Sequence, residues 1–179
     1  MKNIILGVTG SIAAYKAAEI ANKLHKDGYN VEVIMTEGAM KFIAPLTFSS
    51  LTKNRVYTDV FDEKYPREVQ HISLAQKADA FLIAPASADI IGKIASGIAD
   101  DMLTTVVMAV RDIPVIIAPA MNTNMYENLI VQDNISKLKR FGYEFVEPRE
   151  AMLACGVIGK GALAEPDVIV AAIESRLGK

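Results

Sequence analysis

Two side chains in this sequence, a cysteine and a histidine, are candidates for carrying protons near neutral pH, whereas the second histidine, His25, is assigned to solvent. Cys155 is the single cysteine, and it lies in the glycine-punctuated stretch ACGVIGKGALAEP, residues 154–166. His71 is one of two histidines and lies in EVQHISLAQKADA. A thiol titrates near ~8.5 and an imidazole near ~6.5, so both suit acid–base chemistry. The ordinary alternatives are a surface or capping histidine and an inert cysteine in the core.

A second set of residues could hold an anionic ligand. They lie in four stretches that each follow an apolar segment: TGSIAAYK, TEGAM, PASADIIGK and PAMNTNMY. Each pairs a small or hydroxyl residue with an expected helix start, where backbone N–H groups and the helix dipole suit a phosphate. Gly10 and Ser11 alone could be ordinary turn and capping residues. Because GVTGS lacks the full G-x-G-x-x-G spacing, one phosphate fits better than a dinucleotide.

The elements that must position these residues alternate between short apolar runs typical of strands and apolar residues at helical spacing. Strands are predicted at Asn3–Val8, Val31–Met35, Ala80–Ala84, Pro114–Ala118 and 143–147. Helices are predicted at 12–26, 37–43, 87–98, 101–110, 127–140 and 166–177, with Asp100 and Asp101 capping the fourth. Residues 45–70 are ambiguous, and the glycine-rich stretch 154–166 is expected to be a loop.

This alternation predicts parallel βαβ units with right-handed crossovers. The expected fold is therefore α/β, a three-layer doubly wound parallel sheet of Rossmann-like or flavodoxin-like type, in a single domain over residues 1–179. Ligands bind beyond the carboxyl ends of strands in such sheets. The four stretches above are thus expected to meet at one site, with the two that begin Pro-Ala, each after a strand that ends in Ala, forming a wall of it.

Composition narrows the class of protein and its partners. With 19 Lys and Arg against 21 Asp and Glu, the chain has no basic field, and no nucleic-acid partner is expected. One cysteine cannot form an internal disulfide, and no secretory signal is evident, which favours the cytoplasm. Apolar runs fall short of the ~20 residues that span a bilayer, so no membrane segment is expected. With only His25 and His71 available, no metal site is predicted.

Several motifs together resemble one family over essentially the whole chain. They are GVTGSIAAYK at 7–16, QHISLA around His71, PASADIIGKIASGIADD at 85–101, PAMNTNMY at 119–126 and ACGVIGKGALAEP at 154–166. In this order they are similar to the homo-oligomeric flavin-containing cysteine decarboxylases. The resemblance implies a lyase of coenzyme A biosynthesis that uses FMN to convert 4'-phosphopantothenoylcysteine to 4'-phosphopantetheine. The implied route is oxidation to a thioaldehyde, loss of carbon dioxide and reduction of the enethiolate.

The same resemblance implies roles for individual residues. His71 corresponds to the active-site base, and Cys155 corresponds to the proton-donating thiol of a mobile clamp formed by 154–166. Asn122 is implied to hold the substrate carboxylate, in a substrate site that also includes Ala120, Met121 and Met125. FMN is implied to contact residues of the loops described above: Gly10, Ser11, Ile12, Thr36, Ser87, Ala88, Asp89 and Ile90.

The sequence departs from the family pattern at three places. Tyr126 stands where members commonly have Trp, Asp89-Ile90 where many have Asn-Thr, and Ala162-Leu163 where some have Arg-Met. Bacterial members often continue into a second, ligase domain, so a chain that stops at Lys179 is expected to be monofunctional. The resemblance also implies a homotrimer, or a homododecamer built from trimers, with the flavin site at a subunit interface.

Two alternatives from other functional classes stay open. One is an FMN-dependent peptidyl C-terminal cysteine decarboxylase, and the other is a non-catalytic FMN-binding regulatory subunit. The joint presence of His71, Asn122 and Cys155 favours an enzyme. A flavin prenyltransferase is disfavoured by the cysteine-bearing stretch.

Overall fold

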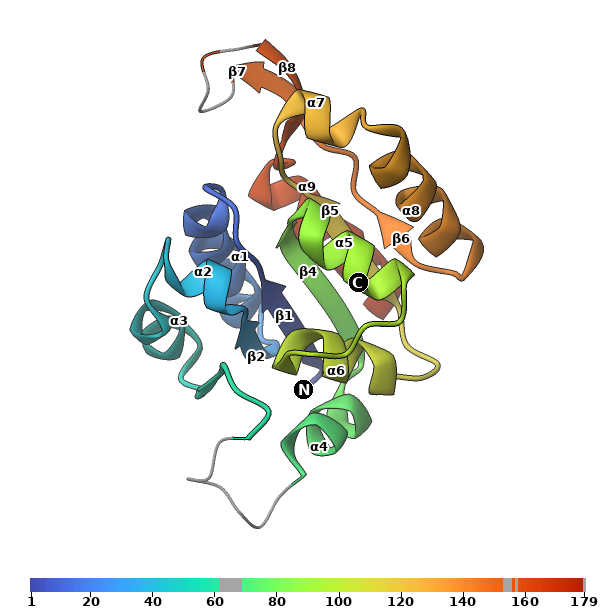
Figure 1. Cartoon of the computed structure of the whole chain (residues 1–179). Coiled ribbons are helices and arrows are strands. Elements are labelled where there is room, and N and C mark those ends of the chain that lie inside the picture. Colours follow the sequence, from blue (N-terminus) through green and yellow to red (C-terminus); the bar gives the residue numbers. More distant parts are fainter. Residues whose placement is uncertain (62–68, 153–155, 157, 179) are drawn as a thin grey trace.

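The computed structural model describes residues 1–61, 69–152, 156 and 158–178. Its main sheet contains β1 (Asn3–Val8), β2 (Asn30–Met35), β3 (Val56–Tyr57), β4 (Ala80–Ala86), β5 (Val115–Pro119) and β6 (Glu144–Phe145). The spatial order is β3-β2-β1-β4-β5-β6, and every neighbouring pair is parallel. The predicted doubly wound parallel sheet is confirmed (Figure 1).

Alternating side chains of the strands build two cores, one on each face of the sheet. Ile4 and Leu6 of β1 point to one core, whereas Ile5 points to the other. The first core is covered by α1 (Ala14–Lys26), α3 (Pro45–Thr52) and α9 (Pro166–Leu177). The second is covered by α4 (Gln70–Lys77), α5 (Ala88–Ala95), α6 (Met102–Ala109) and α8 (Leu129–Arg140). Burial on both faces explains why the central strands read as continuous apolar runs.

One glycine decides how closely a helix approaches the sheet. A Cβ added to Gly7 in β1 would lie 2.8 Å from Leu103 Cδ1 of α6. The missing side chain therefore lets α6 pack directly against the middle of the sheet.

The capping prediction for α6 is confirmed for Asp101, whereas Asp100 pairs with Lys93. Asp101 is the N-cap of α6, and its carboxylate accepts a hydrogen bond of 2.8 Å from the Thr104 N–H. The Thr104 hydroxyl in turn lies 3.2 Å from the Asp101 backbone nitrogen, which completes a capping box. The ambiguous region contains α3 and β3, and the predicted helix over 37–43 is reduced to α2 (Glu37–Met40).

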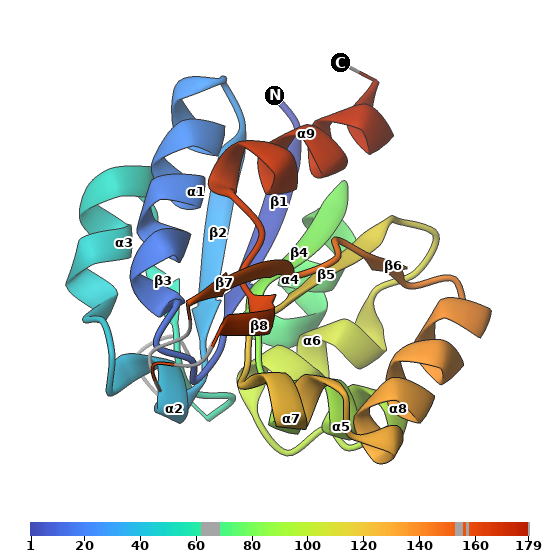
Figure 2. The ribbon, with the colours of Figure 1, turned by 90° about the horizontal axis from the view of Figure 1, so that it is seen from above.

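The prediction of a loop over 154–166 is wrong for residues 158–162. They form β8 (Ile158–Ala162), which pairs antiparallel with β7 (Arg149–Met152). This β7–β8 sheet lies beside the short helix α7 (Thr123–Tyr126), apart from the main sheet (Figures 1 and 2). Glycines at alternate positions hid the strand, because glycine weakens the usual strand signal. Among the described helices, none combines the length and apolarity needed to cross a membrane.

Candidate functional site

The site lies where the strand order reverses, between β1 and β4. A buried hydroxyl holds together the two loops that leave these strands: Thr9 Oγ1 donates to the Pro85 carbonyl at 2.7 Å and accepts from the Ser87 N–H at 2.9 Å. Thr9 is only 1% exposed. Open parallel sheets bind ligands at such a reversal point. Sequence reasoning missed Thr9, although it opens the TGS turn.

A cavity of about 480 Å³ opens at this point. The loops after β1, β4 and β5 bring many of the predicted site residues into its wall: Gly10, Ser11, Ile12, Ser87, Ala88, Ala120, Met121, Asn122 and Met125. The wall also contains residues that were not singled out as site residues, namely Ala13, Tyr15, Lys16, Phe42, Arg149 and Met152, and it contains Gly161 of the stretch expected to be a clamp. Tyr15 and Lys16 end the TGSIAAYK motif, which was a usable signal. Arg149 and Met152 gave none, because β7 was not recognised.

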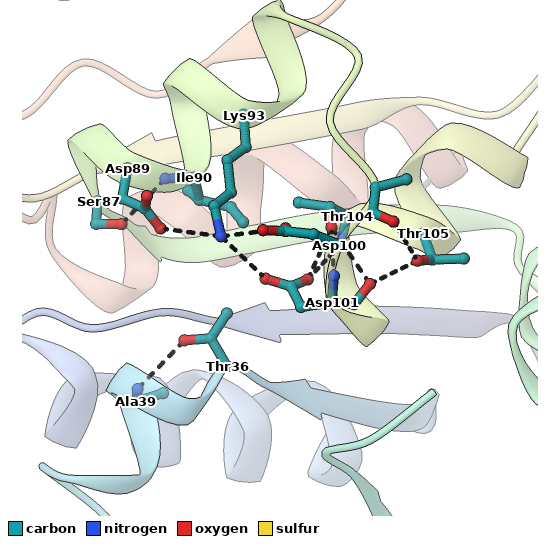
Figure 3. Close-up of polar contacts among 11 residues, drawn as sticks. Thr36, Ala39, Ser87, Asp89, Ile90, Lys93, Asp100, Asp101, Thr104 and Thr105 are labelled. Atoms are coloured by element: carbon teal, nitrogen blue, oxygen red, sulfur yellow. Dashed lines mark hydrogen bonds and ion pairs between the residues drawn. The ribbon is translucent and has the colours of Figure 1, made fainter. Parts of the chain in front are cut away.

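The side chains of Thr36, Asp89 and Ile90 lie outside this wall. Thr36 caps α2 by accepting a hydrogen bond of 3.2 Å from the Ala39 N–H. Ile90 is fully buried in the core, and its N–H donates to Ser87 Oγ, the N-cap of α5, at 3.3 Å. Asp89 turns toward Lys93 one helical turn later, at 3.8 Å (Figure 3). Helix geometry in α5 thus leaves Ser87 and Ala88 at the cavity and directs the next two side chains elsewhere.

Lys93 joins α5 to the start of α6. Its ammonium group lies 3.1 Å from Asp100, 3.8 Å from Asp89 and 3.9 Å from Asp101 (Figure 3). The hydrogen bond to Asp100 and the nearby carboxylates raise the pKa of the Lys93 ammonium, against the effect of partial burial. One lysine therefore offsets part of the negative charge of these three acidic residues. No group of three or more metal-ligating side chains occurs among the residues that the structure describes.

The β7–β8 sheet supplies the wall opposite the loops. The Met121 N–H donates to the Gly161 carbonyl at 2.9 Å, which ties β8 to the end of β5. Gly161 has φ +151°, and a Cβ there would overlap the Met121 carbonyl oxygen. A Cβ at Gly159 would likewise overlap the Thr123 hydroxyl. Two glycines therefore permit β8 to pack directly against the segment that carries Asn122.

Two cations of the cavity wall share one carboxylate. Arg149 Nε lies 2.9 Å from Glu165, and Lys16 Nζ lies 3.5 Å from the other oxygen of the same carboxylate. Arg149 Nε also donates to the Leu163 carbonyl at 3.1 Å. These contacts tie α1, β7 and the start of α9 together. Because two cations share one carboxylate, this part of the cavity wall keeps a net positive charge.

Of the two predicted proton carriers, only His71 lies in the part of the chain that the structure describes. His71 is half-buried at the start of α4, and it does not belong to the cavity wall. Figure 1 shows α4 near the N-terminus, at the end of the molecule away from α7 and β8. Cys155 lies outside the described residues, as does Ala154.

The cavity suits a flavin mononucleotide in size and chemistry. A Cβ added to Gly10 would lie 3.2 Å from the Gly38 Cα, so glycine at this position lets the loops after β1 and β2 lie close together beside the cavity. Ser11 and Ser87 supply hydroxyls near the starts of α1 and α5, which suit a phosphate. Ile12, Met121 and Leu163 supply apolar surface for a ring. Ligand cavities typically have roughly 300–1,000 Å³, which includes the value found here.

Comparison with known proteins identifies the family. The family model described as Flavoprotein matches residues 1–178. The chain belongs to the Flavoprotein family. The resemblance predicted from the motifs is thereby confirmed for this flavoprotein.

Two curated relatives show how far the similarity extends. This flavoprotein is 51% identical to a probable phosphopantothenoylcysteine decarboxylase of Streptococcus mutans, over 98% of its own length and 99% of the relative's. It is also 51% identical to the coenzyme A biosynthesis bifunctional protein CoaBC of Bacillus subtilis, over 99% of its length but only 44% of the relative's. The chain therefore spans less than half of the bifunctional protein.

Solved structures resemble this flavoprotein over nearly the whole chain. One is a mutant PPC decarboxylase complexed with pantothenoylaminoethenethiol, with a TM-score of 0.89, 30% identity and coverage of 99% of both chains. Another is the FMN-dependent cysteine decarboxylase SpaF, with a TM-score of 0.85, 30% identity and coverage of 99% of this chain and 98% of that one. Both resemblances extend through the β7–β8 sheet as well as the main sheet.

Proposed function

We propose that this protein is an FMN-dependent carboxy-lyase of coenzyme A biosynthesis that converts 4'-phosphopantothenoylcysteine to 4'-phosphopantetheine. One observation carries the proposal: the cavity at the β1–β4 reversal is built from motif residues, in a chain 51% identical to the S. mutans relative over almost the full length of both. The reducing cytoplasm, where a free thiol persists, is the proposed location. The small-molecule substrate is the proposed partner.

The cofactor and the chain's residues divide the work. When bound, FMN supplies the two-electron oxidation of the substrate and the later return of those electrons. Gly10, Ser11 and Ser87 would hold it at the helix starts. Asn122, whose carboxamide oxygen accepts from the Asn124 N–H at 2.9 Å, is held at the cavity wall, where its side-chain NH₂ suits a substrate carboxylate.

Proton transfer is assigned to the two remaining candidates. His71 would assist removal of the first proton, and Cys155 would protonate the intermediate during reduction. A thiol suits the second step, because an ordinary pKa of ~8.5 leaves its proton present but transferable at neutral pH. A solved relative that carries a mutation is complexed with pantothenoylaminoethenethiol, an oxidised and decarboxylated compound, which supports a reduction step that a protein residue assists.

A second copy of the chain would complete the site. His71 lies outside the cavity wall of its own chain, whereas exposed apolar side chains surround the cavity, including Ile12 (59% exposed), Tyr15 (62%) and Phe42 (51%). Apolar surface of this kind is typical of an interface. We propose a homotrimer, or a dodecamer of trimers, in which a neighbour supplies His71.

Subunit mixing tests this assembly. His71→Asn and Asn122→Asp should each abolish decarboxylation alone, and co-expression of the two variants should restore part of it, because some sites would then combine intact residues from two chains. Light scattering gives the subunit count. A monomer, or no recovery in mixed oligomers, would refute the shared site.

The substrate is tested directly. Purified protein that is yellow from bound flavin is incubated with 4'-phosphopantothenoylcysteine and, separately, with a peptide that ends in cysteine, and carbon dioxide is measured. Release from the first alone supports the proposal. Release from the peptide alone supports the peptidyl alternative, which the similarity to SpaF keeps in view. Flavin binding without any release supports a regulatory subunit.

The role of Cys155 has a separate readout. Cys155→Ser should retain FMN and still release carbon dioxide, while the oxidised, decarboxylated intermediate accumulates and is detected by mass spectrometry. Formation of normal aminothiol product at the wild-type rate would contradict the protonation role.

A further inference from the structure

Glu147 connects three elements around the β7–β8 sheet. Its carboxylate accepts hydrogen bonds from the Tyr126 hydroxyl of α7 at 2.9 Å, from Lys160 of β8 at 3.0 Å and from Lys139 of α8 at 3.2 Å. Lys160 also lies 5.5 Å from the centroid of the Tyr126 ring, a cation–π contact. We call these four residues the Glu147 cluster. Glu147 itself does not line the cavity.

The Glu147 cluster joins the same two segments that meet at the substrate side of the cavity. Tyr126 ends the segment 120–126, which carries Asn122 and Met125 of the cavity wall. Lys160 lies in β8, next to Gly161, whose carbonyl accepts the Met121 N–H. The Glu147 carboxylate therefore binds both segment 120–126 and β8. It does so a few residues from the Met121–Gly161 hydrogen bond that joins their backbones.

Burial and neighbouring charges fix the protonation states of Tyr126 and Glu147. Tyr126 is only 6% exposed, and burial together with the hydrogen bond to Glu147 raises the pKa of its hydroxyl to about 12. Partial burial acts to raise the pKa of Glu147, but the bonds from Lys160, Tyr126 and Lys139 outweigh it and lower this pKa to about 2. Phenol and carboxylate thus keep donor and acceptor states across the physiological range. The family's common Trp at this position carries an indole N–H in place of the hydroxyl.

We propose that Glu147 is a positioning residue, which holds β8 and segment 120–126 in one arrangement and thereby sets the affinity for substrate. The inference rests on the proposed function, since it concerns the site where Asn122 would bind the substrate carboxylate. Glu147 acts through Tyr126 and Lys160 and touches no reacting atom.

The test compares three substitutions in the FMN-loaded protein. Glu147→Gln removes the charge but keeps the shape, and Lys160→Met removes the β8 partner. Lys139→Met is the matched control. It removes an ion pair with the same Glu147 carboxylate, but Lys139 lies on α8, which belongs to neither segment. We measure KM and kcat with 4'-phosphopantothenoylcysteine, flavin content, and hydrogen exchange of the Met121 and β8 amides.

Glu147→Gln and Lys160→Met should raise KM roughly 3- to 10-fold, the loss expected for one ordinary hydrogen bond, because the half-exposed site weakens the contribution of charge, while kcat stays within about twofold. Amide exchange at Met121 and in β8 should accelerate in both. Lys139→Met should change KM by no more than about twofold: its ion pair is as exposed as that of Lys160, but α8 is neither of the two segments that meet at the substrate side. Flavin content should be unchanged in all three.

An unchanged KM with unchanged exchange in Glu147→Gln and Lys160→Met would overturn the inference. So would equal losses of kcat, flavin and thermal stability without a rise in KM, since these indicate a merely structural role. If the wild type itself releases no carbon dioxide, the proposed function fails. In that case hydrogen exchange still tests the link between β8 and segment 120–126. Unchanged exchange refutes that link, and faster exchange in Glu147→Gln and Lys160→Met but not in Lys139→Met upholds it.

Discussion

The two walls of the cavity are held in different ways. On the cofactor side, the loops after β1 and β4 continue from fully buried parallel strands, and the buried Thr9 hydroxyl bridges them. On the substrate side, the β7–β8 sheet has only two strands, and its exposed contacts centre on Glu147, whose side chain is 51% exposed. Buried contacts resist local opening, whereas short, exposed elements open at low free energy.

This difference assigns separate tasks to the two walls. A cofactor that stays bound through every turnover needs a fixed cradle, which the core of the main sheet supplies. Under the proposed function, a substrate that enters and leaves needs a cover that can move, and a small sheet joined by a few polar contacts would suit this role. Changes on one side should therefore affect flavin and changes on the other should affect substrate.

The largest expected effect is on the substrate side, at Gly161. Gly161→Ala places a Cβ against the Met121 carbonyl oxygen at φ +151°, so β8 can no longer dock as it does. Backbone strain of about 1–3 kcal/mol predicts a fall in kcat/KM of roughly 10- to 100-fold. Flavin content should be retained. Gly142→Ala is the control, because Gly142 also has positive φ (+89°) but no atom within 4 Å of an added Cβ. Wild-type kcat/KM in Gly161→Ala would contradict the docking role of β8.

The matching change on the cofactor side is Gly10→Ala. The new Cβ would lie 3.2 Å from the Gly38 Cα and 3.3 Å from its carbonyl carbon, so the two loops must separate slightly. An overpacking cost of about 1 kcal/mol predicts roughly fivefold weaker FMN binding, measured by quenching of flavin fluorescence. Hydrogen exchange in β8 should stay unchanged. Faster exchange in β8 with normal flavin affinity would reverse the proposed division between the walls.

A pH series tests the polar contacts of the substrate side. The pKa of Glu147 is lowered from 4.5 to about 2, so its stabilising contribution is present above pH 4.5 and is lost as pH falls toward 2. The difference in unfolding free energy between wild type and Glu147→Gln, about 1 kcal/mol or less because the pair is half-exposed, should shrink steadily over this window. Urea unfolding at several pH values measures it. A difference that is undiminished at pH 2 would exclude the carboxylate as its source.

The smallest expected effect lies in α5, away from both walls. Gly92 is within the helix, and an added Cβ would meet only Asn134 Nδ2 at an ordinary 3.8 Å. Gly92→Ala should therefore stabilise the protein by about 0.5–1 kcal/mol through helix propensity. Thermal unfolding measures this gain, and FMN affinity and KM should not change. Destabilisation would show that α5 needs the space that Gly92 leaves.

The sequence was most informative where structure is local and buried. The strands that contain Ile4, Leu82 and Ile116 were readable because burial on both faces demands continuous apolar runs. Asp101 was readable as a cap because its partner Thr104 is three residues away. The loops after these strands followed from the rule that parallel sheets gather their carboxyl ends.

The sequence was least informative where a contact joins residues far apart in the chain, or where the position of a residue around a helix decides which way its side chain points. The β7–β8 sheet was missed because Gly159 and Gly161 carry no strand signal. The motif PASADII gave no sign that Asp89 would turn to Lys93 while Ser87 faced the cavity. The resemblance grouped His71 with the other site residues, yet α4 leaves it outside the cavity wall of its own chain.

By itself, the sequence determined the α/β alternation, the loops of the site after β1, β4 and β5, and membership of the Flavoprotein family, because periodicity and short motifs are properties of neighbouring residues. Only the tertiary structure decided that Thr9 joins two loops 76 residues apart. It also decided that Glu147 faces Tyr126, Lys139 and Lys160 at once. Such contacts depend on strand order and on the packing of separate elements, which no local pattern of residues encodes.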